Sequence, residues 1–181
     1  MKKRPILFID RDGTLIIEPP QTFQVDRLDK LQIIEDAGFV LSKIQKEFDY
    51  LYVMVTNQDG LGTESFPEED FWPPHNEMLR LFEIQGIKFD DVLIDKSREE
   101  DMAPTRKPRT GLVTSYIKGE YDLARSFVIG DRLTDMQFAQ NIGCKGIWLN
   151  LSTPLPNPLQ KVVSLRTKSW RDIYQFLKHQ S

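Results

Sequence analysis

Five short apolar runs, separated by stretches with helical periodicity, limit what this chain can fold into. Three of the runs cover residues 5–9, 51–55 and 126–130, and each is followed at once by polar residues. A continuous apolar run that is bounded by polar or glycine residues is typical of a strand buried on both faces. Two further strands are predicted over residues 89–94 and 146–149.

The segments between these strands carry apolar residues at helical spacing. This spacing predicts helices over residues 34–48, 75–85, 112–121, 134–142 and 170–177, and an exposed loop over 95–109. Strands that alternate with helices favour right-handed βαβ units and a sheet covered on both faces. The predicted fold class is therefore α/β, a Rossmann-like domain of three layers around a central, mostly parallel sheet. We expect a single domain over residues 1–181.

Composition indicates which binding partners and which cellular compartment to expect. The chain has a formal net charge of −3, so no basic field is expected to attract a nucleic acid. It has no apolar run near the ~18 residues of a membrane-spanning helix, so no membrane partner is expected. Its one cysteine, Cys144, forms no internal disulfide and supplies no multi-cysteine zinc site. With no visible signal peptide, these features predict a cytoplasmic protein.

Polar residues follow the apolar runs in an order that suggests chemistry. Asp10 and Asp12 follow the first run, and the second run ends at Thr56 and Asn57. The run over 126–130 is followed by two more carboxylates, and an ammonium lies in the preceding loop: Asp131, Asp135 and Lys107. Ligands bind beyond the carboxyl ends of the strands in open parallel sheets. We therefore expect these groups to meet at one edge of the sheet.

Such a group of carboxylates favours a hard cation and phosphate chemistry. Carboxylates that lie close together repel each other unless a cation relieves them, and oxygen ligands without Cys or His suit Mg²⁺. Phosphoryl transfer needs positive charge around the phosphate and an in-line nucleophile. Asp10 and Asp12, at positions i and i+2 of an extended strand end, both face one phosphate: one attacks phosphorus and the other handles protons.

Each piece also has a plainer interpretation when it stands alone. The Asp10–Asp12 pair with Gly13 fits a solvated turn or a calcium loop, although the rest of an EF-hand pattern is missing. Thr56 and Asp131 fit helix caps, and Lys107 fits a solvated basic loop. The joint occurrence of all these pieces in one order favours the catalytic interpretation.

Four segments carry a resemblance to a known family. Residues 8–14, 55–57, 106–108 and 129–135 resemble, in order, the four motifs of the haloacid dehalogenase (HAD) superfamily. Further segments resemble its histidinol-phosphatase domains: residues 10–15, 18–20, 23–26, 56–63, 65–67 and 74–75. Those domains form the N-terminal half of a bifunctional histidine-biosynthesis enzyme. The resemblance implies a Mg²⁺-dependent histidinol-phosphatase that belongs to a longer chain with a fused imidazoleglycerol-phosphate dehydratase domain.

The resemblance also implies a role for each motif residue. Asp10 is the expected nucleophile and a Mg²⁺ ligand, and Asp12 is the expected general acid and base, whose backbone carbonyl also reaches the metal. Thr56 is expected to bind the phosphate and Lys107 to neutralise it. Asp131 is expected to ligate Mg²⁺, and Asp135 to position Lys107 or a metal-bound water. Two other residues of the motifs are assigned to substrate binding: Asn57 and Arg106.

One segment departs from the related domains. Those domains carry a zinc loop with three Cys and one His before the lysine motif, whereas residues 95–105 contain neither residue type. Zinc is therefore not expected here, because a structural site needs about four such donors, and other contacts must hold the loop. His75 is interpreted as structural, because aspartate chemistry needs no histidine.

The substrate is the least determined part of the prediction. Histidinol carries an ammonium group and an imidazole, so an acidic group at the entrance is expected, with Glu18 as the first candidate and Gln24 as its neighbour. A solvated loop glutamate is the plainer interpretation of Glu18. One alternative function is a sugar-phosphate phosphatase of the heptose bisphosphate type. Another is a non-catalytic, phosphate-binding regulatory module.

Overall fold

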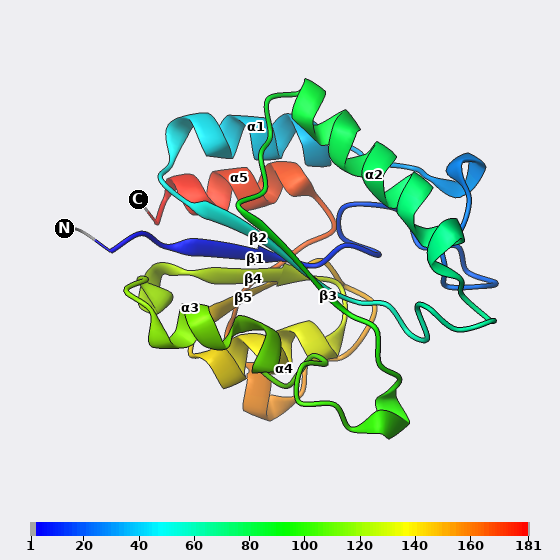
Figure 1. Cartoon of the computed structure of the whole chain (residues 1–181). Coiled ribbons are helices and arrows are strands. Elements are labelled where there is room, and N and C mark those ends of the chain that lie inside the picture. The colour runs from blue at the N-terminus through cyan, green and yellow to red at the C-terminus, as the bar shows by residue number, and fades with distance from the viewer. Residues whose placement is uncertain (1–2, 181) are drawn as a thin grey trace.

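The computed structural model describes residues 3–180, and its centre is a six-stranded sheet in which every strand pairing is parallel (Figure 1). The strand order is β3-β2-β1-β4-β5-β6. The strands are β1 (Ile6–Ile9), β2 (Leu51–Asn57), β3 (Asp91–Asp95), β4 (Phe127–Gly130), β5 (Lys145–Trp148) and β6 (Val163–Arg166). The predicted α/β, Rossmann-like fold class is confirmed.

Helices cover both faces of the sheet and complete the three layers (Figure 1). One face carries α1 (Ala37–Glu47), α2 (Glu68–Ile84) and α5 (Trp170–Lys178), and the other carries α3 (Thr114–Lys118) and α4 (Leu133–Ile142). Short 3₁₀ helices lie in the connections: Leu28–Lys30, Glu99–Asp101, Gly111–Val113, Leu123–Arg125 and Asn157–Leu159.

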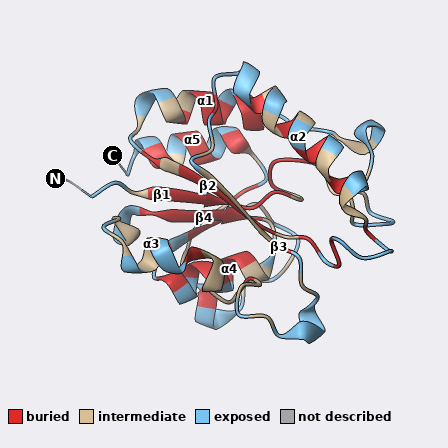
Figure 2. Cartoon of the chain, viewed as in Figure 1, coloured by how far each residue is buried: buried red, intermediate tan, exposed pale blue. Residues whose placement is uncertain are grey.

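Strand β1 explains why an apolar run without alternation forms a strand here. Leu7 and Ile9 pack into the core under α1, α2 and α5, whereas Ile6 and Phe8 pack into the core under α3 and α4. All four side chains have 0% exposure, and Figure 2 shows the central strands buried throughout. Both faces of β1 therefore need apolar residues, and the first polar position is the one where the strand leaves the core.

The start of helix α2 differs from the prediction. The helix begins at Glu68, whereas the sequence predicted 75, and it contains Pro73 and Pro74. Three acidic residues in its first turn interact favourably with the positive end of the helix dipole and so stabilise a start at this position. The side chain of Phe71 is fully buried. Packing of this first part of the helix therefore offsets the backbone hydrogen bonds that the two prolines cannot donate.

Smaller differences concern the edges of the fold. Strand β6 was not predicted, because its residues are only partly buried and form no apolar run. Helix α3 is shorter than predicted: a 3₁₀ turn, Gly111–Val113, precedes it and Gly119 follows its last residue. The loop over 95–109 was predicted to be exposed, but it contains the buried Lys107.

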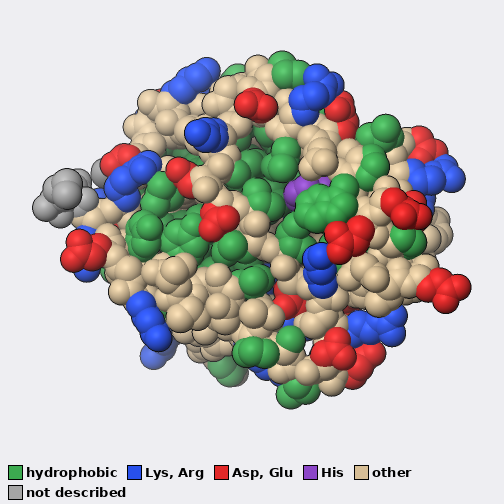
Figure 3. Space-filling view, viewed as in Figure 1, with side chains coloured by type: hydrophobic (Ala, Val, Ile, Leu, Met, Phe, Trp, Pro, Cys, Tyr) green, Lys and Arg blue, Asp and Glu red, His purple; other side chains and the backbone are tan. Residues whose placement is uncertain are grey.

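The surface in Figure 3 carries the edge strand β3. Lys, Arg, Asp and Glu side chains are interspersed there around a central apolar area. Within residues 3–180, no helix combines the length and the apolar character that crossing a bilayer requires.

Candidate active site

The strand order determines where the polar residues meet. Strand β1 lies between β2 and β4, and the chain reverses its direction of winding on the two sides of β1. Asp10 follows β1, Asp131 follows β4, and Thr56 lies near the end of β2. Parallel strands bring all three to the same edge, at the switch point where ligands bind in such sheets.

Three carboxylates form a compact acidic cluster at this edge. Asp10, Asp131 and Asp135 each place one oxygen within 4.8 Å of the others. Oδ1 of Asp131 is buried and has no hydrogen-bond partner. Buried acceptors are normally satisfied, so an orphaned carboxylate oxygen beside two other carboxylates fits a cation site with oxygen ligands. The side chain of Asp12 does not belong to this cluster.

Burial and mutual repulsion act on the acidity of this cluster. Burial raises the pKa of Asp10 well above its usual value, repulsion from Asp135 and Asp131 adds to the effect, and Lys107 opposes it. Burial, together with the charge of Asp135, raises the pKa of Asp131 to about 7. Both shifts come mainly from burial and then from mutual repulsion, and a divalent cation bound at this edge would oppose them.

Lys107 joins two of the three carboxylates. Its Nζ donates to Asp10 Oδ1 at 2.6 Å and to Asp135 Oδ1 at 2.8 Å, and the residue is only 5% exposed. Burial alone would lower the pKa of Lys107, but the charges of Asp10 and Asp135 outweigh it and raise the pKa above its usual value. Of the two roles predicted for Asp135, the structure shows the contact with Lys107.

Asp12 is held by two residues that the sequence did not single out. Nη1 of Arg11 donates to both carboxylate oxygens of Asp12, at 3.0 and 3.1 Å. Nε2 of Gln58 donates to Asp12 Oδ2 at 2.6 Å and to Thr56 Oγ1 at 2.8 Å. Because Gln58 directly follows Asn57, the sequence shows that it lies next to the Thr56–Asn57 motif. The sequence does not show that its side chain points toward Asp12.

Arg11 connects the site to an aromatic cluster behind it. Its guanidinium carbon lies 5.0 Å from the ring centre of Phe71, and the residue is fully buried. Phe71 stacks on His75 with 4.8 Å between ring centres. Burial, with a contribution from Arg11, lowers the pKa of His75 to about 4. His75 thus packs as a neutral ring behind the candidate site.

Two glycines allow the loops to approach the carboxylates. Gly13 has φ +73°, and a Cβ built on it lies 2.4 Å from Asp131 Oδ2. A Cβ on Gly130 lies 2.4 Å from the Asp135 carboxyl carbon. Any larger residue at Gly13 would combine an unfavourable backbone conformation with a collision in the acidic cluster.

Two residues predicted to bind substrate make hydrogen bonds within the protein. The carboxamide of Asn57 pairs with the main chain of Lys107 in both directions, each bond measuring 3.1 Å. Arg106 donates to Asp59 Oδ1 at 2.6 Å and to the carbonyl of Ser97 at 2.8 Å. Both side chains therefore have partners within the protein.

The two candidates for substrate selectivity differ in their surroundings. Arg132 Nη2 donates to Glu18 Oε1 at 2.5 Å. Burial raises the pKa of Glu18, with Arg132 opposing the shift and the charge of Asp12 adding to it. Glu18 thus lies near Asp12. Gln24 is half-buried, and in residues 3–180 no hydrogen bond joins its side chain to the other candidate residues.

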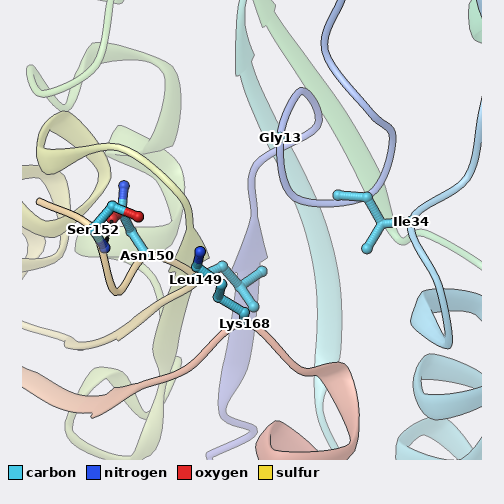
Figure 4. A pocket seen from close by; sticks show the side chains of 6 residues that line it. All are labelled: Gly13, Ile34, Leu149, Asn150, Ser152 and Lys168. Carbon is cyan, nitrogen blue, oxygen red and sulfur yellow. Dashed lines mark hydrogen bonds between the residues drawn. The ribbon is translucent and has the colours of Figure 1, made fainter.

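A cavity of about 270 Å³ lies beside Gly13 (Figure 4), the glycine that approaches Asp131. Gly13 and Ile34 line one side of it, and Asn150 and Lys168 are among the residues on the other. Asn150 Nδ2 also donates to the carbonyl of Asp131 at 3.2 Å. The cavity therefore borders the loop after β1, which carries Asp10, and the loop after β5, which is bonded to the backbone of Asp131. The catalytic candidates do not line it.

Comparison with known families assigns this fold and site to a class. The profile of the HAD-hydrolase-like family matches residues 104–152, a segment that includes Lys107 and Asp131. The chain belongs to the HAD-like hydrolases, and the predicted family resemblance is confirmed.

Curated relatives narrow the similarity further. The chain is 53% identical over 182 residues to the histidine biosynthesis bifunctional protein HisB of Bacteroides fragilis, which covers 97% of this chain and 48% of the relative. It is 46% identical over 187 residues to the protein of the same name from Spirosoma linguale, with 96% and 48% covered. The chain thus spans about half the length of the curated relatives it matches.

Solved structures share the fold at low sequence identity. D,D-heptose 1,7-bisphosphate phosphatase from B. bronchiseptica, complexed with magnesium and phosphate, superposes with a TM-score of 0.81 at 21% identity, covering 98% of this chain and 99% of that one. A HAD-superfamily hydrolase from Ehrlichia chaffeensis gives a TM-score of 0.63 at 16% identity, with 99% and 98% covered.

Proposed function

We propose that this chain is a Mg²⁺-dependent phosphomonoesterase that forms an aspartyl-phosphate on Asp10, and that its substrate is L-histidinol phosphate. One observation carries the proposal: the buried Lys107 bridges Asp10 and Asp135 beside Asp131, whose Oδ1 has no partner. Phosphoryl transfer needs a nucleophilic carboxylate, a fixed positive charge and a carboxylate oxygen that is free to bind a metal ion.

The metal would be held by Asp10 and Asp131, with the backbone carbonyl of Asp12 as a further ligand. The donors are oxygens, as Mg²⁺ prefers, and the raised pKa of Asp131 reflects charge that a cation relieves. When bound, Mg²⁺ offsets the negative charge of the phosphate and of the carboxylates around it. The magnesium and phosphate in the heptose bisphosphate phosphatase of similar fold support this assignment.

In the first step, an oxygen of Asp10 attacks phosphorus while the bond from phosphorus to the substrate oxygen breaks. Asp12, in its protonated form, gives its proton to the departing alcohol. Arg11 and Gln58 orient Asp12 for this transfer, and Gln58 also orients the hydroxyl of Thr56. Lys107 stabilises the charge that builds up on the phosphate oxygens.

In the second step, a water molecule attacks the phosphorus of the aspartyl-phosphate. Asp12, now a carboxylate, takes a proton from that water, and the bond between phosphorus and the Asp10 oxygen breaks. Inorganic phosphate is released, Asp10 is regenerated as a carboxylate, and Asp12 is protonated again for the next cycle. Arg11 and Gln58 hold the side chain of Asp12 in place for this step as well.

The substrate assignment rests on the relatives and on Glu18. Proteins named for histidine biosynthesis share about half of their aligned residues with this chain. Glu18, beside Arg132 and close to Asp12, would offer its carboxylate to the ammonium or imidazole of histidinol. Gln24, Asn57 and Arg106 remain secondary candidates for substrate contacts. Because the chain spans about half of these relatives, we propose that a dehydratase domain is fused to it in the native protein.

A sugar-phosphate phosphatase is the second candidate. The fold similarity to the heptose bisphosphate enzyme favours it, whereas the segments around Glu18 and Phe66 resemble the histidinol-phosphatase domains instead. A regulatory module that only accepts phosphate is less well supported, because Asp12 is oriented by two donors close to the nucleophile.

The deciding experiment is phosphate release from L-histidinol phosphate and from a panel of sugar phosphates, with and without Mg²⁺. We expect selective, Mg²⁺-dependent release from histidinol phosphate, and no release by Asp10→Asn. Release that favours a sugar phosphate would overturn the substrate assignment and keep the mechanism. A stable phosphorylated protein without turnover would indicate the regulatory module.

A further inference from the structure

The segment from residue 96 to residue 106 is closed at its base by one buried carboxylate, Asp95. Asp95 ends β3 and is 4% exposed. Its Oδ1 accepts from the backbone N–H of Ser97 at 3.0 Å and from the Ser97 hydroxyl. Its Oδ2 accepts from the hydroxyl of Thr105 at 2.5 Å. One side chain therefore joins the two ends of the segment.

Each of the three consecutive residues Thr105, Arg106 and Lys107 is hydrogen-bonded to a residue at or just after the end of β2 or β3. Thr105 is bonded to Asp95, Arg106 to Asp59, and the main chain of Lys107 to Asn57. Only Lys107 then reaches into the acidic cluster. The position of its ammonium depends on a backbone whose two preceding residues are anchored outside the cluster.

Asp95 is also coupled to the other side of the site. Its backbone carbonyl accepts from the N–H of Gln58 at 2.7 Å, and the side chain of Gln58 contacts Asp12 and Thr56. The residue thus lies between the two groups that must be aligned on a phosphate, the ammonium of Lys107 and the carboxyl of Asp12.

Physical considerations indicate why a hydrogen-bonding side chain is needed here. Ordering a connecting segment costs conformational entropy, which contacts within the segment must offset. A carboxylate accepts several hydrogen bonds at once, and charge-assisted bonds are stronger than neutral ones. Because Asp95 is buried, removing it would leave the hydroxyl and amide donors around it unsatisfied.

We propose that Asp95 is a positioning residue for Lys107: by tying Ser97 to Thr105 it fixes the ammonium against Asp10. The inference deepens the proposed phosphatase function and rests on it for the kinetic part of the test. It concerns a residue outside the four sequence motifs that makes no contact with the acidic cluster.

Three variants test this role. Asp95→Ala removes the carboxylate that joins Ser97 to Thr105 and leaves the bond from Arg106 to the carbonyl of Ser97 in place. Asp95→Asn keeps a carbonyl oxygen that accepts from Ser97. Its amide NH₂ can donate a hydrogen bond to the hydroxyl oxygen of Thr105, so both ends of the segment stay joined. Asp101→Ala is the matched control, because Asp101 lies in the same segment, is exposed, and accepts only a local bond from Arg98 N.

The functional measurements are steady-state kinetics and the binding of inorganic phosphate by calorimetry, both with Mg²⁺. We expect Asp95→Ala to lower kcat on the order of 10- to 100-fold and to weaken phosphate binding. Asp95→Asn and Asp101→Ala should remain within about threefold of the unmodified chain. In a Lys107→Met background, Asp95→Ala should weaken phosphate binding no further. Additive effects of the two substitutions would overturn the proposal.

Hydrogen exchange gives a result that is independent of catalysis. We expect faster exchange of peptides across 96–110 in Asp95→Ala, unchanged exchange elsewhere, and normal protection in Asp95→Asn. Normal protection in Asp95→Ala would overturn the proposal, as would faster exchange spread over the whole chain. If the unmodified chain hydrolyses no ester, the proposed function fails, and this exchange pattern still decides whether Asp95 orders the segment.

Discussion

Lys107 Nζ lies 2.6 Å from Asp10 Oδ1, which joins two residues 97 positions apart in the sequence. The pair sits where β1 ends, and its second carboxylate partner, Asp135, comes from the first turn of α4. A single ammonium thus holds a carboxylate from each of two chain segments. This arrangement offsets part of the repulsion within the acidic cluster, and among the described residues Oδ1 of Asp131 keeps no hydrogen-bond partner.

The first prediction concerns the charge of Lys107. Lys107→Met should lower kcat for phosphate release by about 10²-fold or more, because it removes a fixed cation from the reacting phosphate. It should also lower the free energy of unfolding by about 3–5 kcal/mol without Mg²⁺, because it leaves buried carboxylates unpaired. Kinetics and denaturant unfolding measure the two effects. Lys96→Met, which affects an exposed lysine paired with Glu68, should change neither.

The second prediction concerns the proton on Asp131. Its pKa is raised to about 7 without metal, so the carboxyl is largely protonated at lower pH and a cation must displace the proton. Mg²⁺ affinity should therefore fall as pH decreases below about 7, by at most about tenfold per pH unit. Calorimetry at pH 6 in two buffers of different ionisation enthalpy should detect proton release. An affinity independent of pH between 6 and 8 would contradict the prediction.

The third prediction concerns His75, whose pKa burial lowers to about 4. The unfolded chain binds a proton at this residue near pH 6.5, whereas the folded chain does so only near pH 4. The stability that His75 contributes is therefore present above about 6.5 and is lost as pH falls toward 4. Between pH 7 and pH 5 this loss is about 2 kcal/mol. His75→Phe, which keeps a ring against Phe71, should remove it.

Denaturant unfolding of the two proteins at pH 5 and pH 7 checks this prediction. The difference between them isolates His75, because the acidic cluster titrates in both. Equal pH dependence in the unmodified chain and in His75→Phe would show that the histidine is not buried in its neutral form.

The sequence predicted the parts of the site that follow from topology. In a parallel sheet, a polar residue directly after a buried strand must lie at the ligand-binding edge, so Asp10, Thr56 and Asp131 were placed without knowledge of any contact. Their roles in catalysis stay predictions. The expected contact of Asp135 with Lys107 is present in the structure.

The parts that were missed depend on tertiary contacts. Arg11 and Asp95 look like surface residues in the sequence, yet both are buried because neighbouring elements cover them. The bonds of Arg106 and Asn57 to the loops after β2 and β3 were not predicted either, and their assignment to substrate stays a prediction. Helix α2 starts before its prolines because Phe71 packs there, a compensation that helix propensity alone does not reveal.

The fourth prediction concerns Gly13. In Gly13→Ala, the new Cβ would lie 2.4 Å from Asp131 Oδ2 at a backbone φ of +73°. We expect the loop after β1 to shift, which weakens Mg²⁺ binding and lowers kcat/KM by about 10²-fold. Gly86→Ala is the matched control, because Gly86 also has a positive φ but an added Cβ there meets nothing within 4 Å. Similar losses of activity in both variants would mean that backbone strain, and not the collision, is responsible.

The last prediction concerns the ion pair between Arg132 and Glu18, which measures 2.5 Å. If Glu18 receives the ammonium of histidinol phosphate, the substrate must displace Arg132 from it. A half-exposed ion pair contributes about 0.2–1 kcal/mol, so Arg132→Ala should lower KM for histidinol phosphate by up to about fivefold. KM for a sugar phosphate, which has no ammonium group, should stay the same. Glu18→Gln should raise KM for histidinol phosphate alone, whereas a higher KM for both substrates in Arg132→Ala would show that Arg132 binds the phosphate.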